Sequence, residues 1–458
     1  MHAKELLREI SDYCRCTGLA ESTFGRRAVN DGKFINRLRN GGRITTETLL
    51  RVRDFMNSHD PVARRDSLLR RSSDLTVPAE PARRDPQFNF RFFHNRQKYL
   101  LFVNTCSEKR VIAGRIALEL ANIHPRPPAA RVFDAGVGDG TVLLRVLRAM
   151  HSRFPHIPFY VVGKEISLED VRLALQKLVD RFCEHPATVL ILTNLTYTDA
   201  PSLAVKSVSA ASSLVWRELR LTGTSAHEFE GQVIELLPFL SENWAATVSP
   251  KTGNPVYERP VVLVVYREDH RFLLDSIIPQ PGGTAANYDL VIASQPYRAR
   301  ATLEFKAKRV VAPLAHALGP GGRLIGIHSH GNDPGMEIIQ VIWPGDNPFI
   351  HDRQQILKMV KQELGSSGRD LTFNAYSDER SVFEYEFHTL PSEISKSIGT
   401  STTLAAWNAA TYVAQIEDDR LVEAASDGLY VQVTQELLRK HGGLWFKDES
   451  YVISRRRD

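Results

Sequence analysis

The spacing of apolar residues over the first part of the chain predicts four short helices. Apolar side chains recur at helical intervals within 3–13, 19–28 and 33–40, and a fourth set begins at Thr46. Between the second and third of these segments, residues 29–32 include Asn, Asp and Gly and favour a tight turn. The third helix is expected to be apolar on one face and polar and basic on the other.

From residue 132 onward, apolar runs of strand length alternate with amphipathic segments of helical length. The expected strands are 132–134, 159–165, 187–193, 288–293 and 323–328. The expected helices between them are 141–150, 167–182 and 302–318. This alternation predicts an α/β fold with a parallel, doubly wound sheet. After a further helix, residues 371–376 and 382–387 are expected to pair as an antiparallel hairpin that closes the sheet.

The same patterns divide the chain into segments. The small helical head covers 1–58, and residues 59–87 read as a linker because they combine proline with paired arginines and lack periodicity. The main domain is expected over 88–390. Within it, 195–287 is far longer than an ordinary connection and predicts an inserted subdomain over the site. Residues 391–458 are expected to be an accessory segment.

Composition narrows the class of protein. The chain has 458 residues, of which 43% are apolar and 24% charged. These fractions are typical of a folded globular chain and exclude disordered and fibrous proteins. No apolar run approaches the roughly 18 residues needed to cross a bilayer, which excludes integral-membrane proteins. Four cysteines without a second pair at zinc spacing favour reduced thiols over a disulfide framework. The N-terminal residues lack an apolar leader core, which makes the cytoplasm the expected location.

Charge is distributed unevenly along the chain. The net charge is +5, but residues 1–98 contain 20 basic and 12 acidic side chains and carry +8, whereas the remaining 360 residues carry −3. A basic head on a near-neutral body suggests that the head meets a polyanion. If a nucleic acid is bound, removal of residues 1–87 is expected to abolish that binding.

Four short helices with a tight turn before a basic third helix resemble the helix-turn-helix domain of lambda-repressor-like regulators. The resemblance covers 1–58 and implies that the third helix enters the major groove of DNA. Lys33, Asn36, Arg37 and Arg39 would then reach phosphates or base edges. A solvated basic bundle that contacts protein is the alternative that the sequence leaves open.

The most informative stretch is a short apolar strand that ends in Asp134 and leads into a helix. Gly136, Gly138 and Gly140 follow it at alternate positions. Glycines in a strand-to-helix turn let the backbone approach a ligand closely, because no Cβ atom intervenes. The spacing differs from that of a dinucleotide fingerprint. The pattern D-x-G-x-G-x-G resembles motif I of class I S-adenosylmethionine (SAM)-dependent methyltransferases.

Later segments fit the same family. The second strand ends in Glu165, where a carboxylate can accept both hydroxyls of a ribose. The passage Leu318-Gly-Pro-Gly-Gly322 matches the family's connection between its fourth and fifth strands. The resemblance implies a seven-stranded, Rossmann-like sheet and SAM as cofactor. It places the methionine end of SAM at 134–140, the ribose at Glu165 and the adenine near Asn194. Tyr99, in an aromatic and basic segment, is a further expected cofactor contact.

Ser294-Gln295-Pro296-Tyr297 follows the fourth strand, where the methyl acceptor lies in this family. It resembles the (Asn/Asp/Ser)-Pro-Pro-(Tyr/Phe) motif of methyltransferases that act on planar amino groups, with Gln295 in place of the first proline. Ser294 and the Gln295 carbonyl would accept hydrogen bonds from the amino group, and Tyr297 would stack on the acceptor. The alternative is a polar turn that closes a strand.

His328 and His330 at the end of the fifth strand are candidates for a general base or an acceptor contact, and no third ligand suggests a metal site. Two functions remain open. The first is a SAM-dependent methyltransferase with a DNA-binding head, whose acceptor is a nucleic-acid base, a small metabolite or a protein. The second is a DNA-binding transcription regulator whose methyltransferase-like body senses SAM or a metabolite without catalysis.

Overall fold

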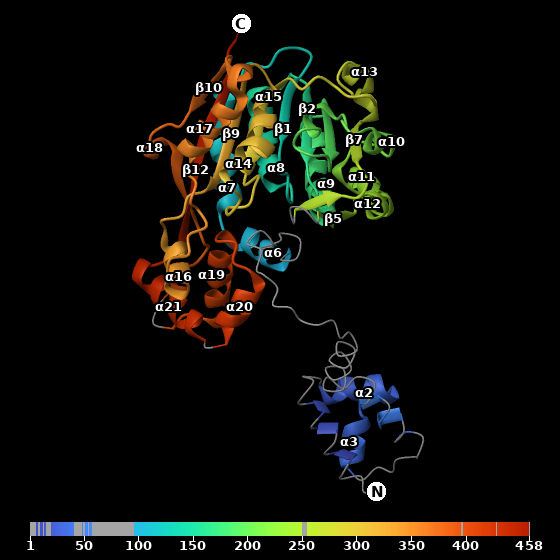
Figure 1. Ribbon diagram of the computed structural model, residues 1–458. Coiled ribbons are helices and arrows are strands. Elements are labelled where there is room, and N and C mark those ends of the chain that lie inside the picture. Colours follow the sequence, from blue (N-terminus) through green and yellow to red (C-terminus); the bar gives the residue numbers. More distant parts are fainter. Residues whose placement is uncertain are drawn as a thin grey trace. The chain divides into compact units, whose positions relative to one another are not determined.

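The computed structural model describes most of the chain as two compact units, Met1–Arg84 and Asp85–Asp458 (Figure 1). The division falls within the expected linker 59–87, which lies outside the described residues. The described residues are 6–7, 10–11, 13–14, 20–40, 48, 51–53, 55–56, 96–249, 254–394, 397–426 and 428–457. No helix among them is long and apolar enough to cross a bilayer.

Where the structure describes the smaller unit continuously, over 20–40, two helices are joined by a tight turn. Helix α2 (Glu21–Val29) ends at Asn30, whose φ of 57° is left-handed, and α3 (Phe34–Arg39) follows. The turn folds closely against α2, because a Cβ atom on Gly25 would lie 2.4 Å from the Asp31 carbonyl oxygen. The buried apolar cluster of this unit also includes side chains from the first and fourth expected helices. Its members are Leu6, Ile10, Cys14, Phe24, Phe34, Ile35, Leu38 and Val52.

The larger unit is built on one ten-stranded sheet, in the order β10-β12-β9-β8-β1-β2-β3-β7-β4, with β11 paired to β12. The five central strands, β9 to β3 in this order, are parallel to one another. The strands are β1 (Ala130–Asp134), β2 (Phe159–Lys164), β3 (Thr188–Thr193), β4 (Val215–Leu221), β7 (Val261–Arg267), β8 (Tyr288–Ser294), β9 (Leu318–Ser329), β10 (Leu371–Asn374), β11 (Val382–Glu386) and β12 (Trp445–Arg455). This confirms the expected α/β class.

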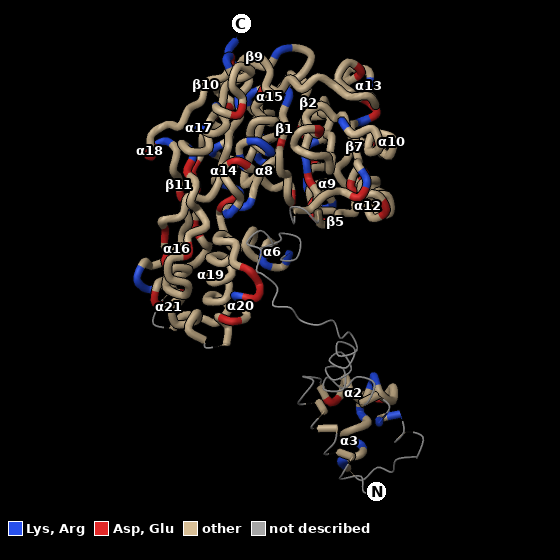
Figure 2. Tube along the Cα trace, in the orientation of Figure 1, with Lys and Arg blue, Asp and Glu red and all other residues tan. Residues whose placement is uncertain are grey.

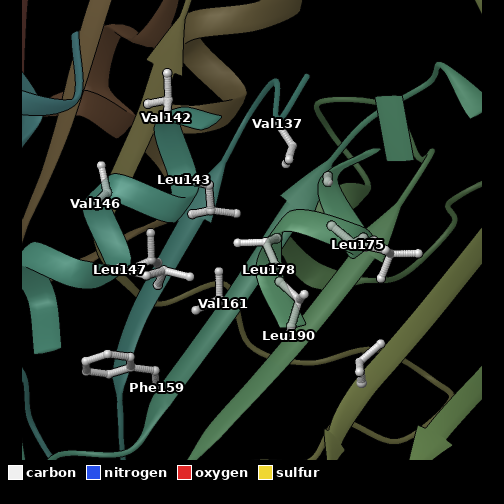
Figure 3. Packing of buried hydrophobic residues seen from close by; sticks show 14 of the residues in the cluster. Val137, Val142, Leu143, Val146, Leu147, Phe159, Val161, Leu175, Leu178 and Leu190 are labelled. Carbon is white, nitrogen blue, oxygen red and sulfur yellow. The ribbon is translucent and has the colours of Figure 1, made fainter. Parts of the chain in front are cut away.

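Helices cover both faces of the sheet. One face is covered by α7 (Glu108–Ala117), α8 (Thr141–Arg153), α9 (Leu168–Glu184), α11 (Ala226–Ile234) and α12 (Leu237–Asn243). The other is covered by α13 (Arg271–Leu274), the π-helical segment η5 (Lys306–Val311), α15 (Ala312–His316) and α17 (Arg353–Leu364). Successive strand residues alternate between the two clusters, as Val132 and Phe133 do. Figure 3 shows Leu143 and Leu147 of α8 beside Val161 of β2.

The segment 195–287, expected to form an inserted subdomain, extends the edge of the sheet. Strand β7 pairs antiparallel with β3, and β4 pairs parallel with β7. All seven residues of β7 are buried, so both faces of this strand are covered. Such burial is typical of a strand in the interior of a sheet. Beside it, β5 (Ala246–Val248) and β6 (Pro255–Tyr257) form a two-stranded sheet. The sheet therefore has ten strands among the described residues, which corrects the seven that the family resemblance implies.

The expected hairpin of 371–376 with 382–387 was wrong. Strands β10 and β11 each pair antiparallel with β12, which lies between β9 and β10. The segment after residue 391 thus supplies a strand that interrupts the expected pairing. A local turn pattern could not indicate this, because the partner strand is far away in the sequence.

Between β11 and β12 the chain adds helices that belong to a separate buried cluster. These are α19 (Thr400–Val413), α20 (Asp418–Ala425) and α21 (Leu429–His441), together with α6 (Arg96–Thr105) and α16 (Pro334–Ile342) from earlier segments. We call these five helices the helical cap. They group at one end of the sheet in Figure 1. The cap brings α6 and α19 together, since Phe102 and Tyr412 have ring centroids 4.7 Å apart.

Candidate functional site

The glycine segment leaves β1 at the carboxyl end of the sheet and turns sharply into α8. Gly138 and Gly140 have left-handed φ values of 54° and 81°. A Cβ atom on Gly140 would lie 2.9 Å from the Cα atom of Ala174 in α9, so the turn requires glycine here for both conformation and space. A Cβ atom on Gly138 would approach the Tyr99 hydroxyl oxygen to 2.9 Å.

A pocket opens where β1 and β8 end. Its walls are Asp134, residues 136–139 of the glycine segment, Val142, Ser294 and Lys109. Asp134 is 1% exposed, and its Oδ1 accepts a hydrogen bond from the Gly136 amide at 3.1 Å. Burial raises the pKa of Asp134 to about 7, although the Gly136 hydrogen bond opposes the shift. A cationic ligand group beside such a buried carboxyl group stabilises its ionised form.

Glu165 lies across from the glycine segment at the end of β2. Its Oε2 accepts a hydrogen bond from the Gly138 amide at 2.9 Å, and its Oε1 accepts from the Ile166 and Ser167 amides at 2.8 Å each. The Glu165 carbonyl accepts a hydrogen bond from Trp244 Nε1 at 3.1 Å, so the 195–287 segment supports this corner. The structure thus brings Asp134, the glycine segment and Glu165 together, and their role in binding a cofactor stays a prediction.

Tyr99 of the helical cap lies over the glycine segment. Its hydroxyl is 3.2 Å from Asp139 Oδ1 and accepts a hydrogen bond from the Asp139 amide at 3.3 Å. The other Asp139 oxygen is bound by Lys177 and by the Thr141 hydroxyl. These contacts pin the glycine segment to both α6 and α9. Sequence reasoning missed Asp139, although it stands inside the glycine motif.

Lys109 is the second site residue that sequence reasoning missed. It is the second residue of α7, its Nζ lies 3.1 Å from Glu108 Oε2, and it lines the pocket beside Asp134. Its Nζ also lies 5.7 Å from the ring centroid of Tyr99. Nothing in the sequence spacing links Lys109 to Asp134, because their proximity arises only when α7 packs beside β1.

Asn194 follows β3, and its side chain is used to hold the neighbouring strand. Its Nδ2 donates to the Arg259 carbonyl at 2.8 Å, and its Oδ1 accepts from the Val261 amide at 2.8 Å. The amide is 1% exposed and joins β3 to the start of β7. A place near the adenine stays a prediction for this residue.

The segment after β8 is strained at Gln295. This residue has a φ of 47°, which is rare for a side chain of its size. Its backbone amide donates to the Ile327 carbonyl at 2.8 Å, and its Nε2 lies 3.1 Å from Ser329 Oγ and 3.3 Å from Asp448 Oδ1. The Pro296 carbonyl accepts a hydrogen bond from Tyr197 at 2.6 Å. The side chain of Gln295 therefore ties β8 to β9 and β12.

Tyr297 is 8% exposed and lines a second pocket. Its ring centroid lies 5.2 Å from Lys306 Nζ and 6.0 Å from the ring of His328. The walls of this pocket are Gln295, Tyr297, Ala299, Lys306, His328, Ser329, Phe349 and His351. Ser294 lines the first pocket and Gln295 the second, so the predicted acceptor segment separates the two.

The two histidines at the end of β9 differ in their surroundings. His328 is buried in the second pocket, and burial lowers its pKa to about 4. His330 does not line this pocket, and a hydrogen bond with Glu449 raises its pKa. Burial of Glu449 opposes its ionisation, but contacts with His330, His328 and Arg353 lower its pKa to about 2. The described residues contain no group of side chains placed to hold a metal ion.

In the smaller unit, the predicted DNA-contacting residues lie on or beside α3 and are exposed: Lys33, Asn36, Arg37 and Arg39. Arg37 pairs with Asp31 at 2.7 Å, and Arg39 pairs with Glu21 at 2.8 Å. Both arginines therefore have carboxylate partners within the head. In the larger unit, basic and acidic residues are interspersed along the chain (Figure 2).

Comparison with models of known protein families finds no match, and comparison with curated protein sequences finds none. Among solved structures, similar chains include geranyl diphosphate methyltransferase in complex with GPP and sinefungin, at 11% identity and a TM-score of 0.29 over 75% of this chain and 78% of that chain. Loganic acid methyltransferase with SAH is another, at 10% identity and a TM-score of 0.28 over 82% and 98%. Similarity at this level does not assign a family or an activity.

Proposed function

We propose that this protein is a SAM-dependent methyltransferase. One observation carries the proposal: the first pocket lies at the carboxyl ends of β1 and β8 and combines a glycine segment, a buried carboxyl group and a facing Ser294. In open α/β sheets, ligands bind at the carboxyl ends of the strands, where the strand order reverses. Here the order reverses at β1, between β2 and β8.

The residues of the pocket fit the chemical groups of SAM. At Gly136, which lines the pocket, a Cβ atom would meet only the Ser294 carbonyl oxygen, at 3.9 Å, so the glycine leaves open space for the cofactor there. Asp134 suits the cationic amino group, and Lys109 suits the carboxylate of SAM. Glu165 is not among the pocket walls but binds the amide of Gly138, which is, and its carboxylate can accept the ribose hydroxyls. Bound SAM supplies an electrophilic methyl group on its sulfonium. The chain's own contribution is to hold the acceptor in line with that methyl group.

The acceptor that we propose is an amino nitrogen of a planar group. Ser294 and the Gln295 carbonyl would orient the nitrogen, and Tyr297 would contact the ring of the acceptor. A nucleic-acid base is slightly favoured over a small metabolite or a protein side chain, because the basic head is suited to bring DNA to the body. The head would bind DNA through Lys33, Asn36, Arg37 and Arg39.

Transfer of tritiated methyl groups from SAM to nucleic acid, metabolite and protein fractions tests this function. Tyr297→Ala should lower methyl transfer at least about tenfold, because the acceptor loses its aromatic contact, while SAM binding stays unchanged. Phe272→Ala is the matched control, since this aromatic side chain is 98% exposed and lines neither pocket. Loss of SAM binding in Tyr297→Ala would refute its role at the acceptor. Labelling of nucleic acid should also be lost from a chain that begins at residue 88.

A second candidate is a DNA-binding regulator that senses SAM or a metabolite without catalysis. The observation that favours it is the strained Gln295, whose side-chain amide is engaged with Ser329 and Asp448. The motif is thereby stabilised in a form that differs from the proline turn of amino-group methyltransferases. Tight SAM binding with no labelled fraction would support the regulator and refute the enzyme.

A further inference from the structure

Lys306 in the second pocket is a buried cation that lacks a carboxylate partner. Lys306 is 2% exposed, and lysine is almost never buried this deeply unless it is paired. No ion pair joins it to a carboxylate within the described part of the chain. Its Nζ donates one hydrogen bond, to the Ala299 carbonyl at 2.8 Å. An ammonium group has three donors, so capacity remains for a ligand.

Two imidazoles beside Lys306 stay uncharged near neutral pH, so Lys306 supplies the positive charge of this pocket. His328 and His351 line it, and for both the pKa is lowered first by burial and then, among other causes, by the charge of Lys306. Glu449 is the acidic side chain that acts on Lys306, but Arg353 binds it at 2.7 Å and through its backbone amide at 2.9 Å. The buried acid is therefore already balanced by another cation.

The rest of the pocket combines polar donors with aromatic surface. Gln295 and Ser329 supply an amide and a hydroxyl, and Tyr297 and Phe349 supply rings. Lys306 begins the π-helical segment η5, and π turns inside helices occur frequently at functional sites. We propose that this pocket binds an oxyanion of the methyl acceptor, a carboxylate or a phosphate, with Lys306 as its counter-ion. That the oxyanion belongs to the methyl acceptor rests on the proposed function, whereas the anion site rests on the pocket alone.

The consequence for the substrate is specific. Residues 294 and 295 are consecutive and line the first and second pockets, so an acceptor anchored by its oxyanion in the second pocket lies next to the first. The acceptor should then be a molecule that carries both a nucleophilic nitrogen and an acidic group. A phosphate on a nucleotide and a carboxylate on a small metabolite share this chemistry.

Calorimetric titration of the full-length protein with inorganic phosphate and with benzoate, at constant ionic strength set with chloride, tests the site. Wild type should bind at least one of the two anions. Lys306→Met should weaken that binding about tenfold or more, because the chain of Met keeps the length and loses the charge. Lys308→Met is the matched control, since Lys308 is exposed in the same helical segment. The anion affinity of this variant should differ from that of wild type by less than about twofold.

A second variant keeps the test decisive if Lys306→Met fails to fold. His351→Ala, at a half-buried position in the same pocket, should also weaken anion binding. Preference for phosphate or for benzoate identifies the source of the oxyanion, and either supports the site. Absence of binding of both anions, or unchanged affinity in the two pocket variants, would overturn it. SAM binding, measured in the same samples, reports separately on the proposed function.

Discussion

At the scale of single residues, burial decides which groups are available for chemistry. Asp134 and Lys306 are both almost fully buried, and each is left with an incompletely balanced charge. Burial raises the pKa of Asp134, and it lowers the pKa of Lys306 to about 8. Asn194 and Gln295 differ, because hydrogen bonds to neighbouring strands already satisfy their amides. The sequence could identify Asp134, Asn194 and Gln295 but not Lys306, and it could not show whether the polar atoms of these residues are free.

The raised pKa of Asp134 predicts a pH-dependent cost to folding. Its pKa is 3.8 in a free chain and about 7 in the fold, so the neutral form is favoured in the native state. The contribution of Asp134 to the free energy of unfolding is fully present below about pH 4 and is lost as the pH rises through about 7. Asp134→Asn, which mimics the neutral form, should resemble wild type near pH 4. It should exceed the unfolding free energy of wild type by on the order of 4 kcal/mol near pH 8.

Urea unfolding of both proteins at several pH values measures this difference. A gap between variant and wild type that stays constant with pH would show that Asp134 is ionised in the native state without cost. The amide keeps an oxygen that can accept from Gly136, so the comparison isolates the charge.

At the scale of elements, the strand, glycine turn and helix from β1 to α8 could be predicted closely from the sequence. The signal was local: an apolar run, alternating glycines and an amphipathic helix. Strand β12 could not be assigned in this way, because its place between β9 and β10 depends on pairing with distant segments. The order of β4 and β7 at the other edge was missed for the same reason, although the apolar run of β7 was visible.

The close contact of the glycine turn with α9 gives a sharp prediction. Gly140→Ala adds a Cβ atom 2.9 Å from the Ala174 Cα atom and imposes a φ of 81° on a residue with a side chain. We expect a loss of about 1 to 3 kcal/mol in the free energy of unfolding and a weaker cofactor site.

Gly114→Ala is the control for this change. Gly114 lies within α7 with no atom near its Cβ position, so alanine should be neutral or stabilising by up to about 1 kcal/mol. Thermal unfolding of the two variants decides the point. Equal stability of both would mean that the turn relaxes freely and that glycine at position 140 is not required.

At the scale of the whole molecule, two units with different charge serve different proposed roles. The surplus of basic residues lies in 1–98, and the remainder of the chain is slightly acidic. Within the larger unit, the sheet places the first pocket at its carboxyl edge, and Tyr99 of the helical cap contacts the glycine segment above it. The sequence located the glycine motif but not the cap, because the five cap helices come from three separate stretches of chain.

The most direct test of this account is a titration of the full-length protein with SAM. We predict one site per chain, and Glu165→Ala should weaken it about tenfold or more because the ribose hydroxyls lose their acceptor. Glu230→Ala, an exposed acid on α11, should bind SAM as wild type does. Absence of SAM binding by wild type, or equal affinity in both variants, would contradict the assignment of the first pocket as a cofactor site.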